Sequence, residues 1–467
     1  MKSTRPGLPT RLLQRAVEVE PTEVRALLLS CAYYFFILSS YYILRPIRDE
    51  VAVASGVRSL PFLFTGTLIL MLLAHPPFAA LVARLPRKRF IAYTYRFFMA
   101  NLLVFFVLLK LAPESSNIWI GRAFFWWVSV FNLFVVSIFW AFTADIFSSA
   151  QGKRLFGFIA LGGTLGAIVG SATTASLAEL FGPVHLILIS IVLLELAVQS
   201  VLRLAGSVRP QGPLPEVAGP TVAGLSEAER RGATMREAEP AAEEPIGGGT
   251  LSGITAVFRS PYLLGICAYM MLYTIAATFL YFQQTDIIGR YIEDRAVRTA
   301  FLARIDLAVN VLAAFTQAFL TGRLVKWLGV ALTLSLLPAL CVFGFAGLGF
   351  WPVMSVFVVF QTLRRAGNYA VARPTREVLY TVVSREDKYK AKNFIDTFVY
   401  RGGDQVGAWS YGLLLWMGLS MSAMAFVAVP ISALWLIVGF WLGRKHERFA
   451  GGRARGKVSA EPAPAIS

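Results

Sequence analysis

Residues 24–50 read VRALLLSCAYYFFILSSYYILRPIRDE, and this stretch decides the class of protein. Residues 24–44 are apolar, aromatic or weakly polar after one early cation. A helix of about 20 such residues crosses the hydrocarbon core of a bilayer. The charged run RPIRDE follows at once, at residues 45–50. The stretch therefore predicts a transmembrane helix that carries charge in or beside its last turns.

Similar apolar runs recur along the whole 467-residue chain. Hydrophobic residues make up 56% of it and charged residues only 15%, whereas a soluble domain is about 25% charged. We therefore expect an all-α integral membrane protein, embedded in the lipid bilayer, and not a large soluble enzyme. The twelve predicted transmembrane helices are 24–44, 59–83, 90–111, 118–142, 155–180, 184–204, 261–282, 300–322, 328–348, 351–371, 394–416 and 421–443.

The formal charge of +17 comes largely from basic residues in separate tails and loops. In a twelve-span layout these segments fall on one side of the membrane. Because short loops rich in Lys and Arg stay in the cytoplasm, we expect both termini to be cytoplasmic, in a multi-pass protein of the bacterial inner membrane. Scattered cations do not form a nucleic-acid surface, so we expect no nucleic acid partner. The segments are the N-terminal tail, Arg84 to Arg89, Lys153 and Arg154, Arg323 and Lys326, Arg385 to Lys392, and the C-terminal tail.

Residues 205–255 interrupt the apolar pattern and are rich in Pro, Gly, Ala and Glu, which is typical of a disordered linker. A short basic turn follows the second span of each half, at 80–90 and 319–330. Two parallel repeats of this kind resemble the major facilitator architecture, which holds its substrate between the halves near the bilayer midplane. The predicted parts are a tail at 1–23, six-helix halves at 24–204 and 256–443 that flank the linker, and a basic tail at 444–467.

Ionisable side chains lie within many of the predicted spans, and arginine predominates among them. Each such charge costs about 2.5–3.5 kcal/mol at the centre of a span, so these residues usually line a cavity or pair with one another. Guanidinium groups match carboxylate and phosphate oxygens in a bidentate way. The set therefore predicts an anionic small-molecule substrate. For any single arginine, a salt bridge between the halves or a side chain that reaches the interface remains an equal alternative.

Two further patterns favour packing over ligand binding. Gly162, Gly166 and Gly170 recur every four residues, which predicts a small-residue ridge for close helix contact. Tyrosines at helical spacing could stack on a nucleobase, although packing is the commoner role. They are Tyr34 and Tyr41 in the first span, and Tyr269 and Tyr273 in the seventh.

Catalytic and metal-binding patterns are missing from the sequence. It has no GxxxxGK[ST] phosphate loop, no metal-ligand spacing and no Ser–His–Asp pattern. Its three cysteines and three histidines lie far apart. We therefore expect no enzyme activity, no cofactor and no metal site, and we expect transport to be driven by gradients or exchange.

Three stretches resemble the bacterial and plastid ATP/ADP translocases, nucleotide transporters that form a divergent branch of the major facilitator fold. YYILRPIRDEVAV at 41–53 is similar to the family's Leu-Arg…Lys-Asp segment. FWAFTADIFSSAQGKRLFGFIALGGTLGAIVGS at 139–171 is similar to its Phe-Trp-Gly-Phe…Glu and Lys-Arg-Phe segments. RPTREVLYTVVSREDKYKAKNFIDTFVYRGGD at 373–404 resembles its Pro-Thr-Lys-Glu…Ile-Asp segment and is the most specific match. This sequence differs in having Arg48 for a lysine, Asp145 for a longer acid, and Arg373 for an acid.

The resemblance implies antiport of nucleotides, ATP against ADP plus phosphate, by a twelve-helix protein. It also implies binding or gating roles for Arg48, Asp145, Arg376 and Glu377. We expect a monomer that exchanges a nucleotide or related phosphorylated anion for a counter-substrate by alternating access. The candidate substrate-binding residues are Arg45, Arg48, Asp145, Arg364, Arg365, Arg376, Glu377 and Arg401. The candidate gating or coupling residues are Asp49, Lys153, Glu195, Asp306, Asp396 and Asp404.

Two other functions stay open at this point. One is proton-coupled transport of another organic anion or a drug, with Asp145, Glu195 or Asp306 as the protonation site in a buried setting. The other is a membrane sensor or scaffold that docks partners through residues 205–255. The second has less support, because a scaffold does not need arginines inside its spans.

Overall fold

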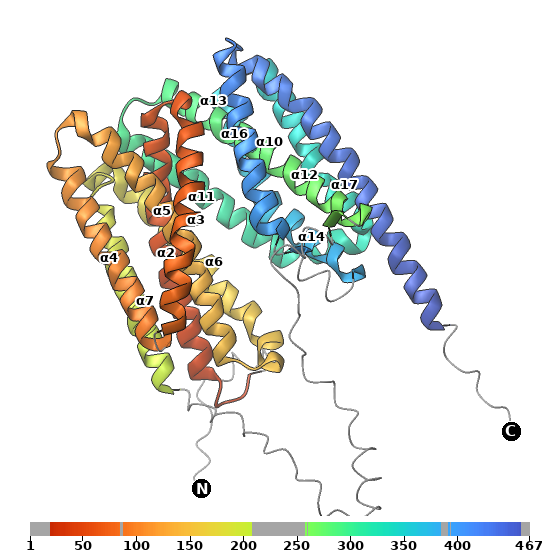
Figure 1. The fold of residues 1–467 in the computed structure, drawn as a ribbon, viewed down its shortest axis with the longest axis horizontal. Helices are drawn as coiled ribbons and strands as arrows, with labels where there is room; N and C mark the ends of the chain where they lie inside the picture. The colour runs from red at the N-terminus through yellow and green to blue at the C-terminus, as the bar shows by residue number, and fades with distance from the viewer. Residues whose placement is uncertain are drawn as a thin grey trace, which may run out of the picture.

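The computed structural model describes residues 19–84, 87–207, 257–258, 260–383, 391–392 and 394–458. The predicted linker at 205–255 therefore lies largely outside the described residues. The described residues contain helices and no strand, which confirms the all-α prediction. In Figure 1 the first group of helices, red to yellow, lies beside the second group, green to blue.

The first half contains six long helices: α2 (Val24–Ser55), α3 (Leu60–Arg84), α4 (Arg87–Leu111), α5 (Glu114–Ile146), α6 (Ser149–Phe181) and α7 (Leu186–Ser207). A 3₁₀ turn, η1 (Val57–Ser59), joins the first two of them. The second half contains α10 (Pro261–Tyr291), α11 (Arg295–Phe319), α12 (Thr321–Phe350), α13 (Met354–Gly367), α14 (Arg373–Leu379), α16 (Tyr400–Trp416) and α17 (Met421–Val458). Between them lie the π turns η2 (Asn368–Ala372) and η4 (Ile395–Val399) and the 3₁₀ turn η3 (Tyr380–Val382).

Ten helices of the described chain are long and apolar enough to cross a membrane. The predicted spans at 351–371 and 394–416 do not meet that criterion, because charged residues interrupt their apolar character. Both regions are nevertheless helical. α13 runs through η2 into α14, and α16 follows η4. α16 packs against α10 and α3, and α13 packs against α11 and α12, so the arrangement is consistent with twelve helices in two groups of six.

Two boundaries differ from the predicted spans in a way that matters for the site. α2 ends at Ser55, not near residue 44, and it continues through Pro46. α10 ends at Tyr291, nine residues past the predicted end of its span at residue 282. The predicted spans ended before these charged residues, whereas in the structure the charged residues belong to the helices. As a result Arg45, Arg48, Asp49 and Glu50 all lie on the body of α2.

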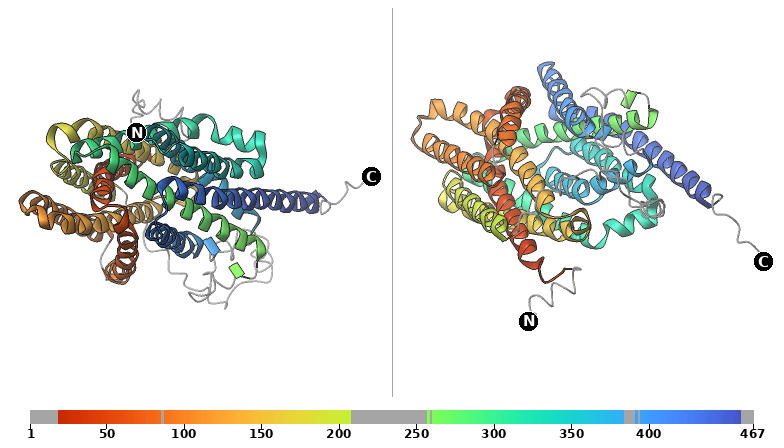
Figure 2. Two further views of the ribbon diagram at one scale, coloured as in Figure 1. Left: turned by 90° about the horizontal axis from the view of Figure 1, so that it is seen from above. Right: turned by 60° about the horizontal axis from the view of Figure 1, so that its bottom comes forward.

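α2 begins and α17 ends at the same end of the bundle (Figure 1). We call this the termini end, where α2 begins and α17 finishes, and we call the opposite one the far end. Figure 2 shows α17 projecting beyond the other helices toward the C-terminus. α17 spans 38 residues, or roughly 57 Å at 1.5 Å per residue, which is well beyond the ~30 Å hydrocarbon core.

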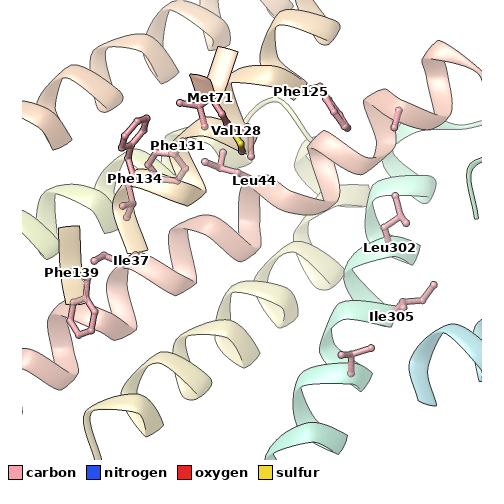
Figure 3. Close-up of a cluster of buried hydrophobic side chains, with 14 of the residues drawn as sticks. Ile37, Leu44, Met71, Phe125, Val128, Phe131, Phe134, Phe139, Leu302 and Ile305 are labelled. Atoms are coloured by element: carbon pink, nitrogen blue, oxygen red, sulfur yellow. The ribbon is translucent and has the colours of Figure 1, made fainter. Parts of the chain in front are cut away.

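The core of the first half is built from aromatic and aliphatic side chains of α2, α3 and α5 (Figure 3). Ile37 and Leu44 on α2, and Phe131 and Phe139 on α5, are fully buried. This packing holds α2 firmly in its own half. It therefore fixes the position of the charged residues that follow Leu44.

The glycine ridge of α6 packs against α2 within the same half. Gly162, Gly166 and Gly170 lie against the backbone of Cys31, Phe35 and Ser39, respectively. The Ser39 hydroxyl donates a hydrogen bond to the Gly166 carbonyl at 3.0 Å. The packing interpretation of the ridge is confirmed, and its place is inside one half instead of between the halves.

We expect Gly166→Ala to destabilise the protein, because a Cβ there would collide with the Phe35 backbone. Overpacking of this kind costs about 1–3 kcal/mol. Gly157→Ala is the matched control on the same helix, since a Cβ at Gly157 meets open space, and alanine favours the helix by up to about 1 kcal/mol. Thermal unfolding of the purified variants in detergent measures both effects. A melting temperature of the Gly166 variant equal to or above that of the Gly157 variant would contradict the packing.

Candidate functional site

A polar cavity of about 260 Å³ lies between the two halves. α2, α3 and α5 line it from the first half, and α10, α13, η2 and α16 line it from the second. We call it the central cavity. Its charged lining residues are Arg45, Arg48, Asp49, Arg364, Arg365, Arg401 and Asp404, and its other polar lining residues include Thr67, Ser129, Asn132, Tyr273, Tyr281, Gln284, Gln361, Tyr369, Tyr400 and Gln405.

Five guanidinium groups and two carboxylates thus line one cavity. Arg48 donates to Asp49 Oδ1 from Nη2 at 2.6 Å and from Nε at 3.0 Å. The hydroxyl of Tyr281, on α10, donates to the same Oδ1 at 3.1 Å. Asp49 therefore joins the two halves and holds Arg48 in a fixed orientation, with its guanidinium 5.3 Å from the ring centre of Phe125.

A layer of three charges closes the termini side of the central cavity. Asp306, on α11, is 2% exposed. Its Oδ1 lies 2.6 Å from Arg365 Nη2, and its Oδ2 lies 3.7 Å from Arg45 Nε. The layer joins the halves because Arg45 belongs to α2, whereas Arg365 and Asp306 belong to the second half. Two arginines share one carboxylate, so the layer carries an excess of positive charge.

The other two arginines are held from the second half alone. Arg364 donates to Gln361 Oε1 at 3.2 and 3.3 Å, and the Gln361 amide donates to Gln284 Oε1 at 2.7 Å. Arg401 lies 3.4 Å from Asp404 Oδ2, one turn along α16. Arg364 thus has a neutral partner, which leaves its charge available to an anion.

A second cavity, of about 540 Å³, lies between the halves on the termini side of the Asp306 layer. Tyr34, Trp140 and Gly163 line it from the first half, and Arg373 and Glu377 line it from the second. Tyr369 lines both cavities. The Asp306 layer and Tyr369 therefore separate two spaces that lie in succession along the path between the halves.

On the far side of the layer, ion pairs and hydrogen bonds join the halves. Glu50 is fully buried and pairs with Arg295 at 3.1 Å and with Arg298 at 3.7 Å. Thr65, on α3, donates to Gln405 Oε1 on α16 at 2.9 Å. These contacts hold the far end of the bundle together, as a conformation closed at that end requires.

We expect Glu50→Gln to weaken this closure, because both arginines then lose their carboxylate. A cysteine placed at Ser129, in a background without Cys31, Cys267 and Cys341, reports access to the central cavity. Its labelling by a membrane-impermeant thiol reagent added at the far end should accelerate at least about tenfold, which corresponds to about 1.4 kcal/mol. Unchanged labelling would show that this contact does not control access.

The structure brings together most, but not all, of the residues predicted for the site. Seven line the central cavity, namely Arg45, Arg48, Asp49, Arg364, Arg365, Arg401 and Asp404, and Asp306 bridges two of them. Glu377 lines the second cavity and pairs with Lys392 at 2.6 Å.

Five predicted residues lie elsewhere or are not described at the side chain. Arg376 pairs with Asp396 at 3.7 Å, within the second half. Glu195 pairs with Arg96 at 3.3 Å, within the first half. Asp145 is exposed near the end of α5. The side chain of Lys153 lies outside the described set. The central cavity is not lined by Arg376, Asp396, Glu195 or Asp145, and the predicted roles of all five residues stay predictions.

Sequence reasoning missed the neutral polar residues of the cavity. Gln361 lies three residues before Arg364, and Gln405 follows Asp404 directly. Helical spacing relative to the arginines could have identified both. Gln284 and Asn132 carry no such signal, because only the tertiary fold brings α10 and α5 to the cavity. Of the four tyrosines singled out, Tyr273 lines the cavity, whereas Tyr34 stacks on Phe139 at 4.1 Å and Tyr269 donates to the Leu334 carbonyl.

Comparison with known proteins supports both the fold and the resemblance. No family model matches the chain. ADP,ATP carrier protein 2 of Chlamydia pneumoniae is 25% identical over 236 residues, 45% of this chain and 44% of that protein. ADP,ATP carrier protein 1 of Chlamydia muridarum is 28% identical over 208 residues, 40% of this chain and 39% of that protein. The chain thus spans less than half the length of the curated relatives it matches.

Solved structures match over almost the whole chain at low identity. A bacterial homologue of the iron transporter ferroportin, in an inward-facing state, aligns with a TM-score of 0.60 at 11% identity, over 91% of this chain and 100% of that one. An auto-inhibited POT family peptide transporter aligns with a TM-score of 0.58 at 14% identity, over 91% and 97%. The chain is therefore a multi-pass membrane protein with the fold of the major facilitator transporters, related in sequence to ADP,ATP carrier proteins over less than half of its length.

Proposed function

We propose that this protein is a secondary transporter that exchanges nucleotides, or a related phosphorylated anion, by alternating access. The observation that carries the proposal is the convergence of five arginines from both halves on one cavity. Guanidinium groups bind phosphate oxygens through paired hydrogen bonds. A ligand with several phosphate oxygens can engage Arg45 and Arg48 of the first half and Arg364 and Arg401 of the second at once.

The excess of positive charge also favours exchange over one-way release. Two carboxylates and the nearby Asp306 balance only part of the charge of five arginines, and buried charge without a partner is costly. The empty cavity is therefore unfavourable, and the halves rearrange most easily with an anion bound. Obligatory coupling of uptake to release follows from this.

Within this mechanism Asp306 and the substrate compete for the guanidinium groups of Arg45 and Arg365. It pairs with Arg365 at 2.6 Å and with Arg45 at 3.7 Å, so its single negative charge offsets part of the charge of both arginines when the cavity holds no anion. A phosphate group that enters the central cavity takes over these guanidinium groups and releases Asp306. Because the layer joins α2 to the second half, its release loosens the contact between the halves at the point that separates the two cavities.

The relatives named as ADP,ATP carriers favour a nucleotide as that anion. Aromatic side chains near the arginines also support it, since Tyr273, Tyr281, Tyr369 and Tyr400 line the same cavity and a nucleobase stacks well on such rings. The cavity volume of about 260 Å³ lies just below the range for pockets that hold drug-sized ligands, about 300–1,000 Å³. Nucleotide binding then requires the halves to separate slightly from this conformation.

A thermal-shift screen of the detergent-solubilised protein tests the proposed ligand class. A ligand that binds only the folded state stabilises it by about 2.7 kcal/mol at a hundred times its Kd. ATP and ADP should raise the melting temperature, and the nucleosides without phosphate should not. If only other organic anions raised the melting temperature, such an anion would replace the nucleotide as the proposed substrate. No rise with any phosphorylated or carboxylated anion would contradict it.

Proton-coupled transport of another anion is the second candidate. Uptake into liposomes that contain the purified protein distinguishes it from nucleotide exchange. Proton coupling predicts uptake that is driven by an imposed pH gradient and needs no counter-substrate inside. Exchange predicts uptake that needs a counter-substrate inside and does not need a pH gradient. The buried carboxylate of Asp306 and the partly buried one of Asp404 make the comparison worth performing.

A further inference from the structure

A long apolar groove lies on the outer surface of the second half, between α12 and α17. Its volume is about 870 Å³, larger than that of the central cavity. The groove is lined almost wholly by apolar side chains, and its only charged lining residues are Arg444 and Arg448. Ile437 on α17 is 65% exposed, and Leu332 on α12 is 48% exposed, so the groove faces away from the bundle.

The dimensions of the groove fit one leaflet of a bilayer. Along α17 it runs from Leu436 to Arg448, which is about 18 Å at 1.5 Å per residue. Half of the hydrocarbon core is about 15 Å thick, and the headgroup layer adds several more. The groove as a whole therefore has about the length of one leaflet. Its apolar lining on α17, from Leu436 to Trp441, covers roughly 8 Å of that length, and the two arginines occupy the end where a headgroup would lie.

The charges are confined to the termini end of the groove. Arg444 and Arg448 are one helical turn apart and both exposed, and neither forms an ion pair with the described residues. Lys445 lies beside them, with its ammonium 4.7 Å from the ring centre of Trp441. The adjacent carboxylate, Glu447, accepts a hydrogen bond from the Ala331 amide at 3.1 Å. The groove mouth thus offers positive charge to an anion, while its nearest acid has another partner.

We propose that this groove is a binding site for an anionic phospholipid of the leaflet at the termini end, which the positive-inside rule predicts to be cytoplasmic. The phosphate-containing headgroup binds Arg444 and Arg448, and an acyl chain lies between α12 and α17 along Leu332 and Ile437. Basic side chains near a membrane surface attract anionic lipids by about 1 kcal/mol each. The proposal is independent of the transported substrate.

Native mass spectrometry of the full chain tests the site. The protein is titrated with phosphatidylglycerol or phosphatidylcholine of identical acyl chains. We expect one phosphatidylglycerol to bind more tightly than phosphatidylcholine. Arg444→Gln/Arg448→Gln should weaken this binding by about fivefold per arginine and leave phosphatidylcholine unchanged. Ala339→Trp, which fills the deep end of the groove, should weaken the binding of both lipids.

A double variant with the same change in charge serves as the control. Arg89→Gln/Arg290→Gln removes two exposed arginines on α4 and α10 and should leave the preference for phosphatidylglycerol intact. Equal loss in the control, or no loss in the Arg444/Arg448 variant, would overturn the proposal. The proposal would also be overturned if the parent protein formed a dimer and Ala339→Trp disrupted it, because the groove would then be the interface with a second copy of the chain.

Discussion

Replacing Asp306 by asparagine is expected to abolish exchange and to lower stability strongly. The change keeps the shape of the side chain and removes the charge that Arg365 and Arg45 share. Removing one partner of a buried ion pair costs about 3–5 kcal/mol, because the remaining charge stays buried without compensation. Exchange should fail as well, because the layer between the two cavities then loses the group with which the substrate competes.

Asp286→Asn is the matched control for this prediction. Asp286 lies 2.7 Å from Arg290, nearly the same distance as in the buried pair, but the side chain of Arg290 is 62% exposed. An exposed helical pair contributes only about 0.3–0.5 kcal/mol. Thermal unfolding and exchange should therefore be close to those of the parent. If Asp306→Asn behaved like Asp286→Asn in both assays, the Asp306 layer would have no part in stability or transport.

Replacing Arg48 by glutamine is expected to abolish nucleotide exchange together with nucleotide binding. Arg48 lines the central cavity and is held by Asp49, so it presents its remaining guanidinium nitrogen to the substrate. Losing a charged hydrogen bond to a phosphate costs about 1.5–3 kcal/mol, or more than tenfold in affinity. The rise in melting temperature with ATP or ADP measures binding, and exchange in liposomes measures transport.

Arg376→Gln provides the contrast, because the resemblance to the translocases implies a role for this residue that its position does not explain. Arg376 lies outside the central cavity, next to Asp396 and the Met270 sulfur. We expect the variant to lose exchange and to keep the nucleotide-dependent rise in melting temperature. If the Arg376 variant lost the nucleotide-dependent rise in melting temperature and the Arg48 variant kept it, the nucleotide would bind at Arg376 and not at Arg48.

The helices followed from the sequence more reliably than their ends. Apolar runs marked every long helix, because burial in lipid demands about 20 apolar residues whatever the tertiary contacts are. The extension of α2 to Ser55 could not be predicted in this way. Glu50 is stable inside the protein only because Arg295 and Arg298, about 245 positions later, neutralise it. An ion pair between residues so far apart in the chain leaves no periodic pattern in the sequence.

The candidate site was predictable in its chemistry and less so in its membership. Arginines within spans pointed to an anion-binding cavity, and Arg45, Arg48, Arg364, Arg365 and Arg401 do converge on one. Asp145 was predicted from its charge at the end of a span and from the resemblance, and the fold leaves it exposed near the end of α5. The order of the helices in space, which brings α10 and α16 to the same cavity as α2, decides which charges meet.

Counter-exchange in proteoliposomes tests the central claim most directly. Vesicles that contain the purified protein are loaded with unlabelled ADP or ATP, and labelled nucleotide is added outside. We predict rapid, saturable uptake that requires nucleotide inside, does not require a pH gradient, and disappears in the Arg48→Gln variant but not in Arg290→Gln. Uptake no greater than in protein-free vesicles, for ATP, ADP, other nucleotides and phosphate alike, would contradict the account.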